Sequence, residues 1–182
     1  MLELSMEVNM VNEIIKKRKS IRKYDQSGVV TDEQIKTLLE AAMLAPSAVN
    51  SRPWEFIVVR NHEKLDAITK FHPYTQMLKT APVAIIMTAN PNALTGSKVT
   101  NMEFWQQDCG AATQNILLQA ADMGFGTCWC GLYPNKPVAD SVAKLFDIPV
   151  DQIPFCVIAI GVPDETFGSR GYYDEKKVRW VN

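Results

Sequence analysis

Basic side chains gather in one short stretch near the start of the 182-residue chain. The segment "IIKKRKSIRKYD", residues 14–25, holds six Lys and Arg in eight consecutive positions, although the whole chain has a net charge of −1. In an extended chain Arg18, Ser20 and Arg22 would share one side, spaced about 6.6 Å apart. Two guanidinium groups and a hydroxyl could then hold an elongated ligand with an anionic end. Arg18 is a better phosphate ligand than the lysines of the cluster, because its planar guanidinium group donates two parallel hydrogen bonds.

The alternative interpretation is a solvated basic helix end, since runs of like charge are commonly exposed. Lys16, Lys17 and Lys23 fit that description. Outside the cluster, 13 Lys and Arg stand against 20 Asp and Glu, which is a net charge of −7. A nucleic-acid surface needs basic residues spread along a face, so this distribution favours a local anion site instead.

A second polar stretch, "APSAVNSRPWEF", occupies residues 45–56. Ser47, Asn50, Ser51 and Arg52 supply hydrogen-bonding groups in a turn that two prolines restrict. Such a turn fits a ligand-binding loop as well as it fits a structural Asx turn that leads into a strand.

A third stretch, "GFGTCWCGLYP", occupies residues 124–134. Its glycines do not form a dinucleotide fingerprint, because that motif follows a strand and opens a helix, whereas here a helix ends and a strand begins. The strand end instead offers the backbone amides of Cys130, Gly131 and Leu132, and Gly131 has no side chain to block a ligand.

The cysteines indicate buried, reduced thiols and no metal centre. A C-x-C pair leaves too little chain for an ordinary disulfide, and the chain has only two histidines to complete a zinc site. Free cysteine commonly behaves as a small hydrophobic residue. The four are Cys109, Cys128, Cys130 and Cys156.

Helices and strands are predicted from hydrophobic spacing and end signals. "TDEQ", residues 31–34, is a capping box that opens a helix ended by Pro46, and Gly124 closes a long helix from about residue 101 to 123. Further helical stretches are expected at about 8–17 (from Val8, Val11, Ile14 and Ile15), 62–70, 74–80 and 137–146, and strands at 54–60, 83–89, 126–132 and 155–162.

This order predicts a single α+β domain over residues 1–182, with a central sheet of mixed direction flanked by helices and an extended C-terminal arm. The strand at 83–89 is apolar on both faces and is therefore expected to be central. The sequence shows no secretory signal and no membrane span, which predicts a cytoplasmic protein.

In combination, "RKSIRKYD", "APSAVNSRPWEFIVV", "WQQDCGAATQNILLQAADMGFGTCWCGLYP" and a final "IGVP" resemble the nitroreductase family of FMN-dependent oxidoreductases, over nearly the whole chain. The resemblance implies a homodimer with two FMN sites at its interface. It implies ping-pong hydride transfer from NADH or NADPH, through FMN N5, to nitroaromatics, quinones or related acceptors. The chemistry is then the flavin's, and no catalytic side chain is required.

The resemblance also assigns roles to residues. Arg18 and Ser20 would hold the phosphate and ribityl end, Lys19 would contribute through its backbone or at the flavin edge, and Arg22 would reach the N1 and O2 side, where a cation stabilises the reduced ring. The polar loop within residues 45–56 would approach the flavin from the second subunit. Backbone donors at the end of the strand within residues 124–134 would face the flavin N5 and O4. The loop residues are Pro46, Ser47, Ala48 and Asn50. The donors toward N5 and O4 are Cys130 and Gly131, and Leu132 is a further cofactor-binding candidate at the strand end.

Several assignments depart from the family pattern. A cation beyond the last strand usually joins the phosphate site; Arg170 is the candidate, with Lys176, Lys177 and Arg179 as rivals. Phe104 and Trp105 could stack on a substrate, although aromatic residues at helical spacing are more often core. Two other functions stay open: reductive dehalogenation or flavin fragmentation on the same fold, and flavin binding or redox sensing without catalysis. Lys98 and Glu103, without a nearby Tyr, lower the dehalogenation option.

Overall fold

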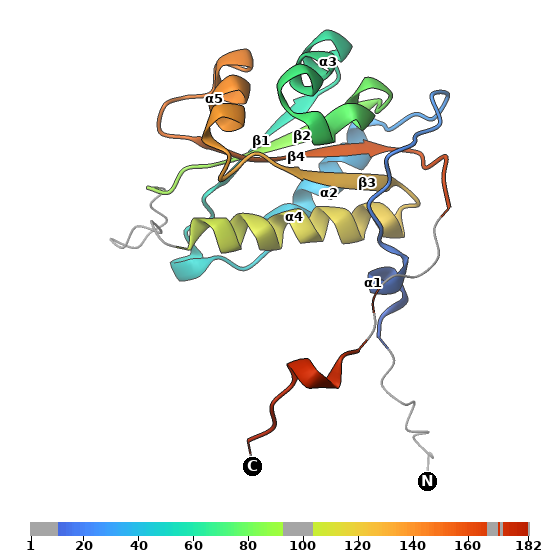
Figure 1. The fold of residues 1–182 in the computed structure, drawn as a ribbon, viewed down its shortest axis with the longest axis vertical. Coiled ribbons are helices and arrows are strands. Elements are labelled where there is room, and N and C mark those ends of the chain that lie inside the picture. Colours follow the sequence, from blue (N-terminus) through green and yellow to red (C-terminus); the bar gives the residue numbers. More distant parts are fainter. Residues whose placement is uncertain (1–10, 93–103, 167–170, 172, 182) are drawn as a thin grey trace.

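The computed structural model describes residues 11–92, 104–166, 171 and 173–181. Four strands form one sheet in the order β1-β2-β4-β3, and Figure 1 shows helices on both of its faces, with α3 and α5 on one side and α4 on the other. The strands are β1 (Trp54–Val59), β2 (Val83–Ala89), β3 (Gly126–Gly131) and β4 (Ile153–Gly161). The helices are α1 (Glu13–Lys17), α2 (Asp32–Met43), α3 (His62–Phe71), α4 (Trp105–Asp122) and α5 (Lys136–Leu145), with 3₁₀ turns η1 (Ala48–Asn50), η2 (Pro73–Lys79) and η3 (Glu175–Lys177).

The prediction of a mixed sheet was wrong, because all three described strand pairings are antiparallel. The connection between β1 and β2 explains the error. Val59, at the end of β1, pairs with Ala84, at the start of β2, so α3 and η2 together return the chain to the end it left. A single crossover helix would have returned it to the opposite end and made the pair parallel.

The other predicted elements are confirmed with small shifts at their ends. All seven residues of β2 are buried, as expected for an inner strand covered on both faces. Both bonds of the capping box between Thr31 and Gln34 are present at the start of α2. Gly124, just past α4, has φ +82°, the left-handed conformation that ends helices.

The first helix is shorter than predicted within the described residues. Asn12 caps it by accepting a hydrogen bond from the Ile14 amide at 2.9 Å, so α1 begins at Glu13. Residues 8–10 of the predicted helix, and 101–103 of the predicted long helix, lie outside the described residues.

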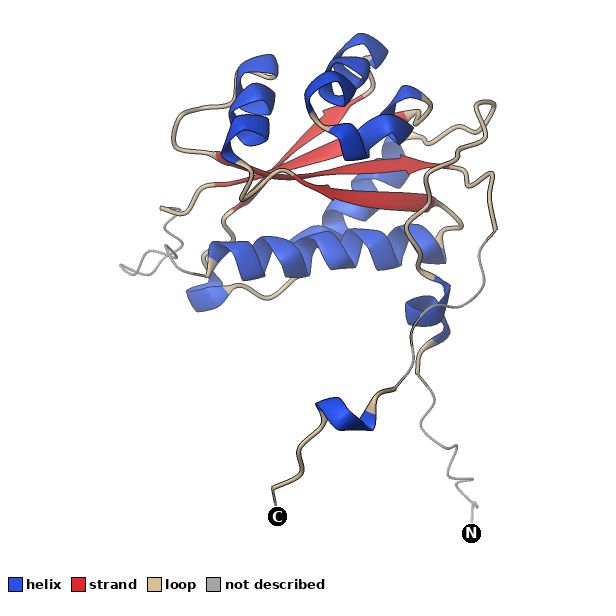
Figure 2. Ribbon diagram, viewed as in Figure 1, coloured by secondary structure: helices blue, strands red, loops and turns tan. Residues whose placement is uncertain are grey.

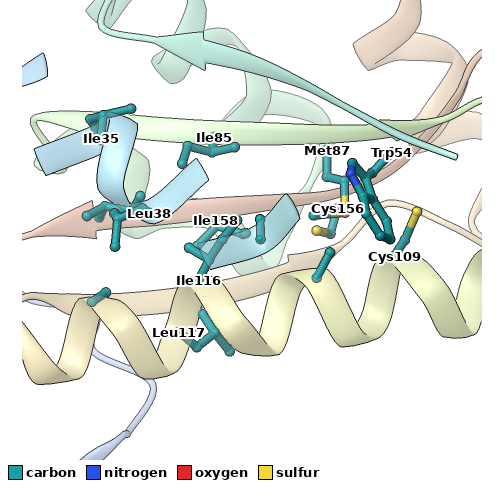
Figure 3. Packing of buried hydrophobic residues seen from close by; sticks show 14 of the residues in the cluster. Ile35, Leu38, Trp54, Ile85, Met87, Cys109, Ile116, Leu117, Cys156 and Ile158 are labelled. Carbon is teal, nitrogen blue, oxygen red and sulfur yellow. The ribbon is translucent and has the colours of Figure 1, made fainter. Parts of the chain in front are cut away.

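Two hydrophobic cores lie on opposite faces of the sheet. In Figure 3, Ile116 of α4 lies beside Ile158 of β4, and Cys109 of α4 lies beside Trp54 of β1, within one core that α2 also helps to form. The other core joins α3, η2 and α5 to the second face of the sheet. Figure 2 shows this arrangement as a red sheet between blue helices. No helix in the described ranges is long and apolar enough to cross a bilayer.

Candidate functional site

The basic stretch leaves α1 and continues in extended form along the edge of β3. Ser20 forms a parallel bridge with Thr127, and the Ile21 amide donates to the Thr127 carbonyl at 2.8 Å. Ile21 is buried, whereas Ser20 and Arg22 are exposed. The predicted extended conformation is therefore confirmed, and the apolar side chain between the two polar ones fixes the stretch to the sheet.

A carboxylate from beyond β4 holds the same stretch from its other side. Glu165 Oε1 accepts hydrogen bonds from the amides of Arg22 and Lys23, the second at 3.1 Å. The Asp164 amide donates to the Lys23 carbonyl at 3.0 Å, and the Tyr24 hydroxyl donates to the Ile21 carbonyl at 2.8 Å. Because the backbone is held between β3 and residues 164–165, the position of the Arg22 backbone is determined by the fold. The sequence analysis missed Glu165, which no local pattern distinguishes from a surface acid.

Hydrogen-bond parity in β3 decides which backbone groups face outward. The Leu132 amide donates to the Phe155 carbonyl at 2.9 Å, and in an antiparallel ladder every second residue then bonds the same partner strand. The Cys130 amide is thereby directed at Val157 of β4. Gly131 and Trp129 have the opposite parity, so their amides point to the edge of the sheet.

This parity corrects part of the predicted donor set. Leu132 cannot donate its amide to a ligand because Phe155 already accepts it, and its side chain is fully buried. The Cys130 amide is turned inward for the same reason. Gly131 remains a donor at the edge, and Trp129 joins it. A sequence that identifies the strand does not give its hydrogen-bond phase, which depends on the partner.

A cavity of about 410 Å³ opens beside this edge. Arg22 lines it together with Trp129, Cys130 and Gly131 of β3. Its opposite wall comes from a segment that the sequence analysis missed: His72, Pro73, Tyr74, Gln76 and Met77, from the start of η2.

His72 connects the two walls of the cavity. It is 7% exposed, and its Nε2 is 2.9 Å from the Gly131 carbonyl oxygen, so Nε2 carries the proton and donates. Its buried Nδ1 has no hydrogen-bond partner among the described residues. The bond aligns Gly131 at the strand edge. The sequence does carry a signal for this wall of the cavity: the polar and aromatic residues of "HPYTQ", residues 72–76, interrupt the apolar spacing of the helical stretches on either side.

All four cysteines are buried and free, as predicted. Cys128 and Cys130 point from β3 into the core shared with η2, with their Sγ atoms 3.9 Å apart. The contact with the Cys130 thiol lowers the pKa of Cys128, with a smaller contribution from the Arg22 guanidinium. The same contact with Cys128, followed by burial, raises the pKa of Cys130.

The polar loop at residues 45–53 is a strained turn beside the start of α4. Val49, Asn50 and Arg52 have φ of 49°, 55° and 47°, in the left-handed region that non-glycine residues seldom adopt. Ser47 Oγ accepts from the Arg52 amide at 3.0 Å, and the Ala48 amide donates to Asp108 of α4 at 3.1 Å. Clustered strain of this kind is typical of functional segments. Among the described residues the loop, Pro46 included, is not part of the cavity lined by Arg22.

Among the described residues, several other predicted site residues do not line the Arg22 cavity. Trp105 is 4% exposed and packs edge-on against Tyr133 and Phe155, so the prediction that it stacks on a substrate was wrong; its large apolar ring is part of the core. Phe104 is 48% exposed. Lys19 lines a separate hollow of about 260 Å³. Arg170, Lys98 and Glu103 lie outside the described residues.

Comparisons with known proteins agree with this architecture. The profile of the Nitroreductase family matches residues 15–72 and 69–162. A Methanothermobacter thermautotrophicus protein, provisionally named an NADH dehydrogenase/NAD(P)H nitroreductase, is 47% identical over 168 residues, covering 92% of this chain and 85% of its own.

Two solved structures extend the match to three dimensions. An FMN-dependent nitroreductase from Clostridium difficile superimposes with a TM-score of 0.81 at 33% identity, covering 93% of this chain and 98% of its own. A provisionally named nitroreductase from Desulfovibrio desulfuricans, in complex with FMN, gives 0.75 at 27% identity and covers 93% and 95%. The extended basic stretch, the sheet edge beside it and these matches together show that the chain belongs to the Nitroreductase family of flavin oxidoreductases.

Proposed function

We propose that this protein binds FMN along the edge of β3 and uses it to reduce nitroaromatics, quinones or related acceptors at the expense of NADH or NADPH. The observation that carries the proposal is the cavity that Arg22 lines together with Trp129 and Gly131, whose amides point to the edge of the sheet. The cavity presents hydrogen-bond donors and a cation to one flat ligand edge. That combination suits a ring system that gains negative charge on reduction.

The residues present fit FMN in their donor chemistry. A flavin edge offers carbonyl oxygens and ring nitrogens, which the amides at the β3 edge can satisfy, and Gly131 leaves room because it has no side chain. Arg18 and Ser20 would hold the phosphate and ribityl end, with Lys19 beside them. When bound, FMN supplies two-electron redox chemistry between the nicotinamide and the acceptor. Arg22 stabilises negative charge at the ring, and His72 keeps Gly131 in place through the bond to its carbonyl.

The proposed assembly is a homodimer, in which the loop at residues 46–50 of one chain reaches the flavin of the other. Two features support it. The loop is strained yet lies outside the Arg22 cavity of its own chain. Leu44 is 83% exposed and Trp180 is 76% exposed, and large exposed apolar side chains of this kind mark contact surfaces.

The C-terminal segment is proposed as an arm that packs on the second chain. Figure 1 draws η3 well apart from the sheet and its helices. A segment with few contacts in its own chain is expected to gain order by packing elsewhere. The cation that completes the phosphate site would come from this part of the chain, with Arg170 as the candidate and Lys176, Lys177 and Arg179 as alternatives.

Flavin content and turnover test the proposal directly. We expect the purified protein to be yellow, to lose its colour with NADH or NADPH in the absence of oxygen, and to regain it when a nitroaromatic or a quinone is added. A colourless protein that takes up no added FMN would refute the proposal. A yellow protein that neither nicotinamide reduces would instead support flavin binding without this catalysis.

A pair of substitutions tests the phosphate site. Arg18→Ala should weaken FMN binding at least about tenfold, because a charge-assisted bidentate contact is lost. Lys23→Ala removes a neighbouring cation expected to be solvated and should leave the affinity within about twofold. Equal affinity of the two variants would remove Arg18 from the site.

A further inference from the structure

Three sulfur atoms meet beside the cavity at β3. Cys128 and Cys130 lie two residues apart on the same face of the strand, and their Sγ atoms are 3.9 Å apart. Met77, from η2 on the opposite wall, places its Sδ 4.0 Å from the Cys130 Sγ. All three side chains are buried in the core formed with η2 and also line the cavity, so the sulfur atoms lie where that core borders an opening.

The spacing of these atoms suits one shared metal ion. If an ion forms metal–sulfur bonds of roughly 2.3 Å, two sulfur atoms 3.9 Å apart subtend roughly 116° at it, and a pair 4.0 Å apart subtends roughly 121°. Both angles are near the 120° of trigonal coordination. Cys130 is therefore suitably spaced from each of the other two sulfur atoms to share an ion with it, and closing Cys128 and Met77 around that ion completes three-coordinate geometry.

A disulfide fits the same cysteines less well. Residues two apart on a strand have Cα atoms about 6.6 Å apart, close to the upper limit of the roughly 4.4–6.8 Å that disulfides span. Closing the bond would also bring the sulfur atoms to about 2.05 Å, which requires the strand to bend where it pairs with β4.

The donor set selects the class of ion. Two thiolates and a thioether are soft ligands, which favour Cu(I) over ions that prefer oxygen or nitrogen. Among the described residues no group of three or more His, Cys, Asp and Glu is placed to hold a metal, so a conventional zinc site has no counterpart here. Two thiolates around a monovalent cation leave one negative charge, and Arg22, which lines the same cavity, supplies a nearby positive charge.

We propose that Cys128, Cys130 and Met77 form a binding site for a soft monovalent metal cation, Cu(I) being the biological example. Binding replaces the two thiol protons, which leave to solvent, and changes no oxidation state. This site is separate from the flavin-binding backbone groups at the edge of β3, because the thiols project from the face of the strand into the core formed with η2.

Anaerobic titration with Cu(I) against a chromogenic Cu(I) chelator tests the site, using reduced full-length protein with and without saturating FMN. We expect one Cu(I) per chain. Cys128→Ser and Cys130→Ser should each weaken uptake at least about 30-fold, because each removes one of two thiolates. Cys109→Ser, which alters a buried thiol of the other core, should bind as the unaltered protein does. Absence of uptake, or undiminished uptake by the Cys128 and Cys130 variants, would overturn the proposal.

X-ray absorption at the copper edge gives a second measurement that does not depend on a thiol variant remaining folded. The loaded protein should show three sulfur ligands, and Met77→Leu, which retains both thiols, should show two. Nitrogen or oxygen ligands in place of sulfur would contradict the assignment. So would a protein that forms a Cys128–Cys130 disulfide on mild oxidation yet binds no Cu(I) after reduction.

Discussion

Replacing Gly126 by Ala tests whether β3 determines the position of the basic stretch. A Cβ at residue 126 would lie 2.7 Å from both Cβ and Cγ2 of Ile21, where carbon atoms normally stay about 3.5–4.0 Å apart. Rotation about χ1 of Ile21 would move its Cγ2 but would leave its Cβ in place, so a side-chain rotation does not remove the clash. The stretch must therefore move outward by roughly 1 Å, and overpacking of this kind costs about 1–3 kcal/mol. Because Arg22 is the next residue, it moves away from the β3 edge.

Two measurements separate the effect on stability from the effect on the site. Urea unfolding should show the loss of about 1–3 kcal/mol, and flavin fluorescence titration should show FMN binding at least about tenfold weaker, equivalent to 1.4 kcal/mol. Gly28→Ala is the matched control, since its Cβ would lie 2.6 Å from Val162, another β-branched residue, and Gly28 does not line the Arg22 cavity. Gly28→Ala should lose similar stability but keep FMN affinity within about threefold. Unchanged FMN affinity in Gly126→Ala, or an equal loss in both variants, would refute the role assigned to β3.

Three further predictions concern residues around the site and in the core. Glu165→Ala removes the acceptor for the Arg22 and Lys23 amides and should cost about 1 kcal/mol in urea unfolding and weaken FMN binding about fivefold; Glu165→Gln, which retains an acceptor, should lose less. Val49→Gly relieves a left-handed β-branched residue and should raise the free energy of unfolding by about 1 kcal/mol; a lower melting temperature would contradict the strain. Burial raises the pKa of Cys109, and that of Cys156 to about 12, so unfolded thiols ionise first as the pH rises. The contribution of these thiols to the free energy of unfolding should be fully present below about pH 8.5. Above that pH it should fall by at most about 1.4 kcal/mol per pH unit per thiol. Cys109→Ala should make this fall shallower.

The sequence was sufficient where a local interaction decides the structure. The capping box formed because Thr31 and Gln34 satisfy each other's amides within one turn, whatever packs around them. Gly124 ended α4 because few other residues adopt its backbone conformation. The apolar run of β2 required burial on both faces, and the sheet supplied it.

Features that depend on residues distant in the sequence could not be predicted from the sequence. Strand direction followed from the return path through α3 and η2, which a list of elements does not specify. The inward turn of the Cys130 amide depends on the phase of the ladder with β4, and a shift of one residue would reverse it. His72 meets Gly131 across 59 positions of sequence, so only the folded chain identifies it as part of the site.

The exposed edge of β3 explains why these features occur together. An edge strand with unsatisfied backbone groups invites pairing with other chains unless something covers it. Within the described residues, the stretch around Ser20 and Ile21 bridges the edge at Thr127, and His72 satisfies the Gly131 carbonyl farther along. The outward amides of Trp129 and Gly131 are left for a ligand. The covering stretch carries Arg22 to the same cavity, so the arrangement that protects the sheet edge also brings together the donors and the cation proposed to hold the FMN ring.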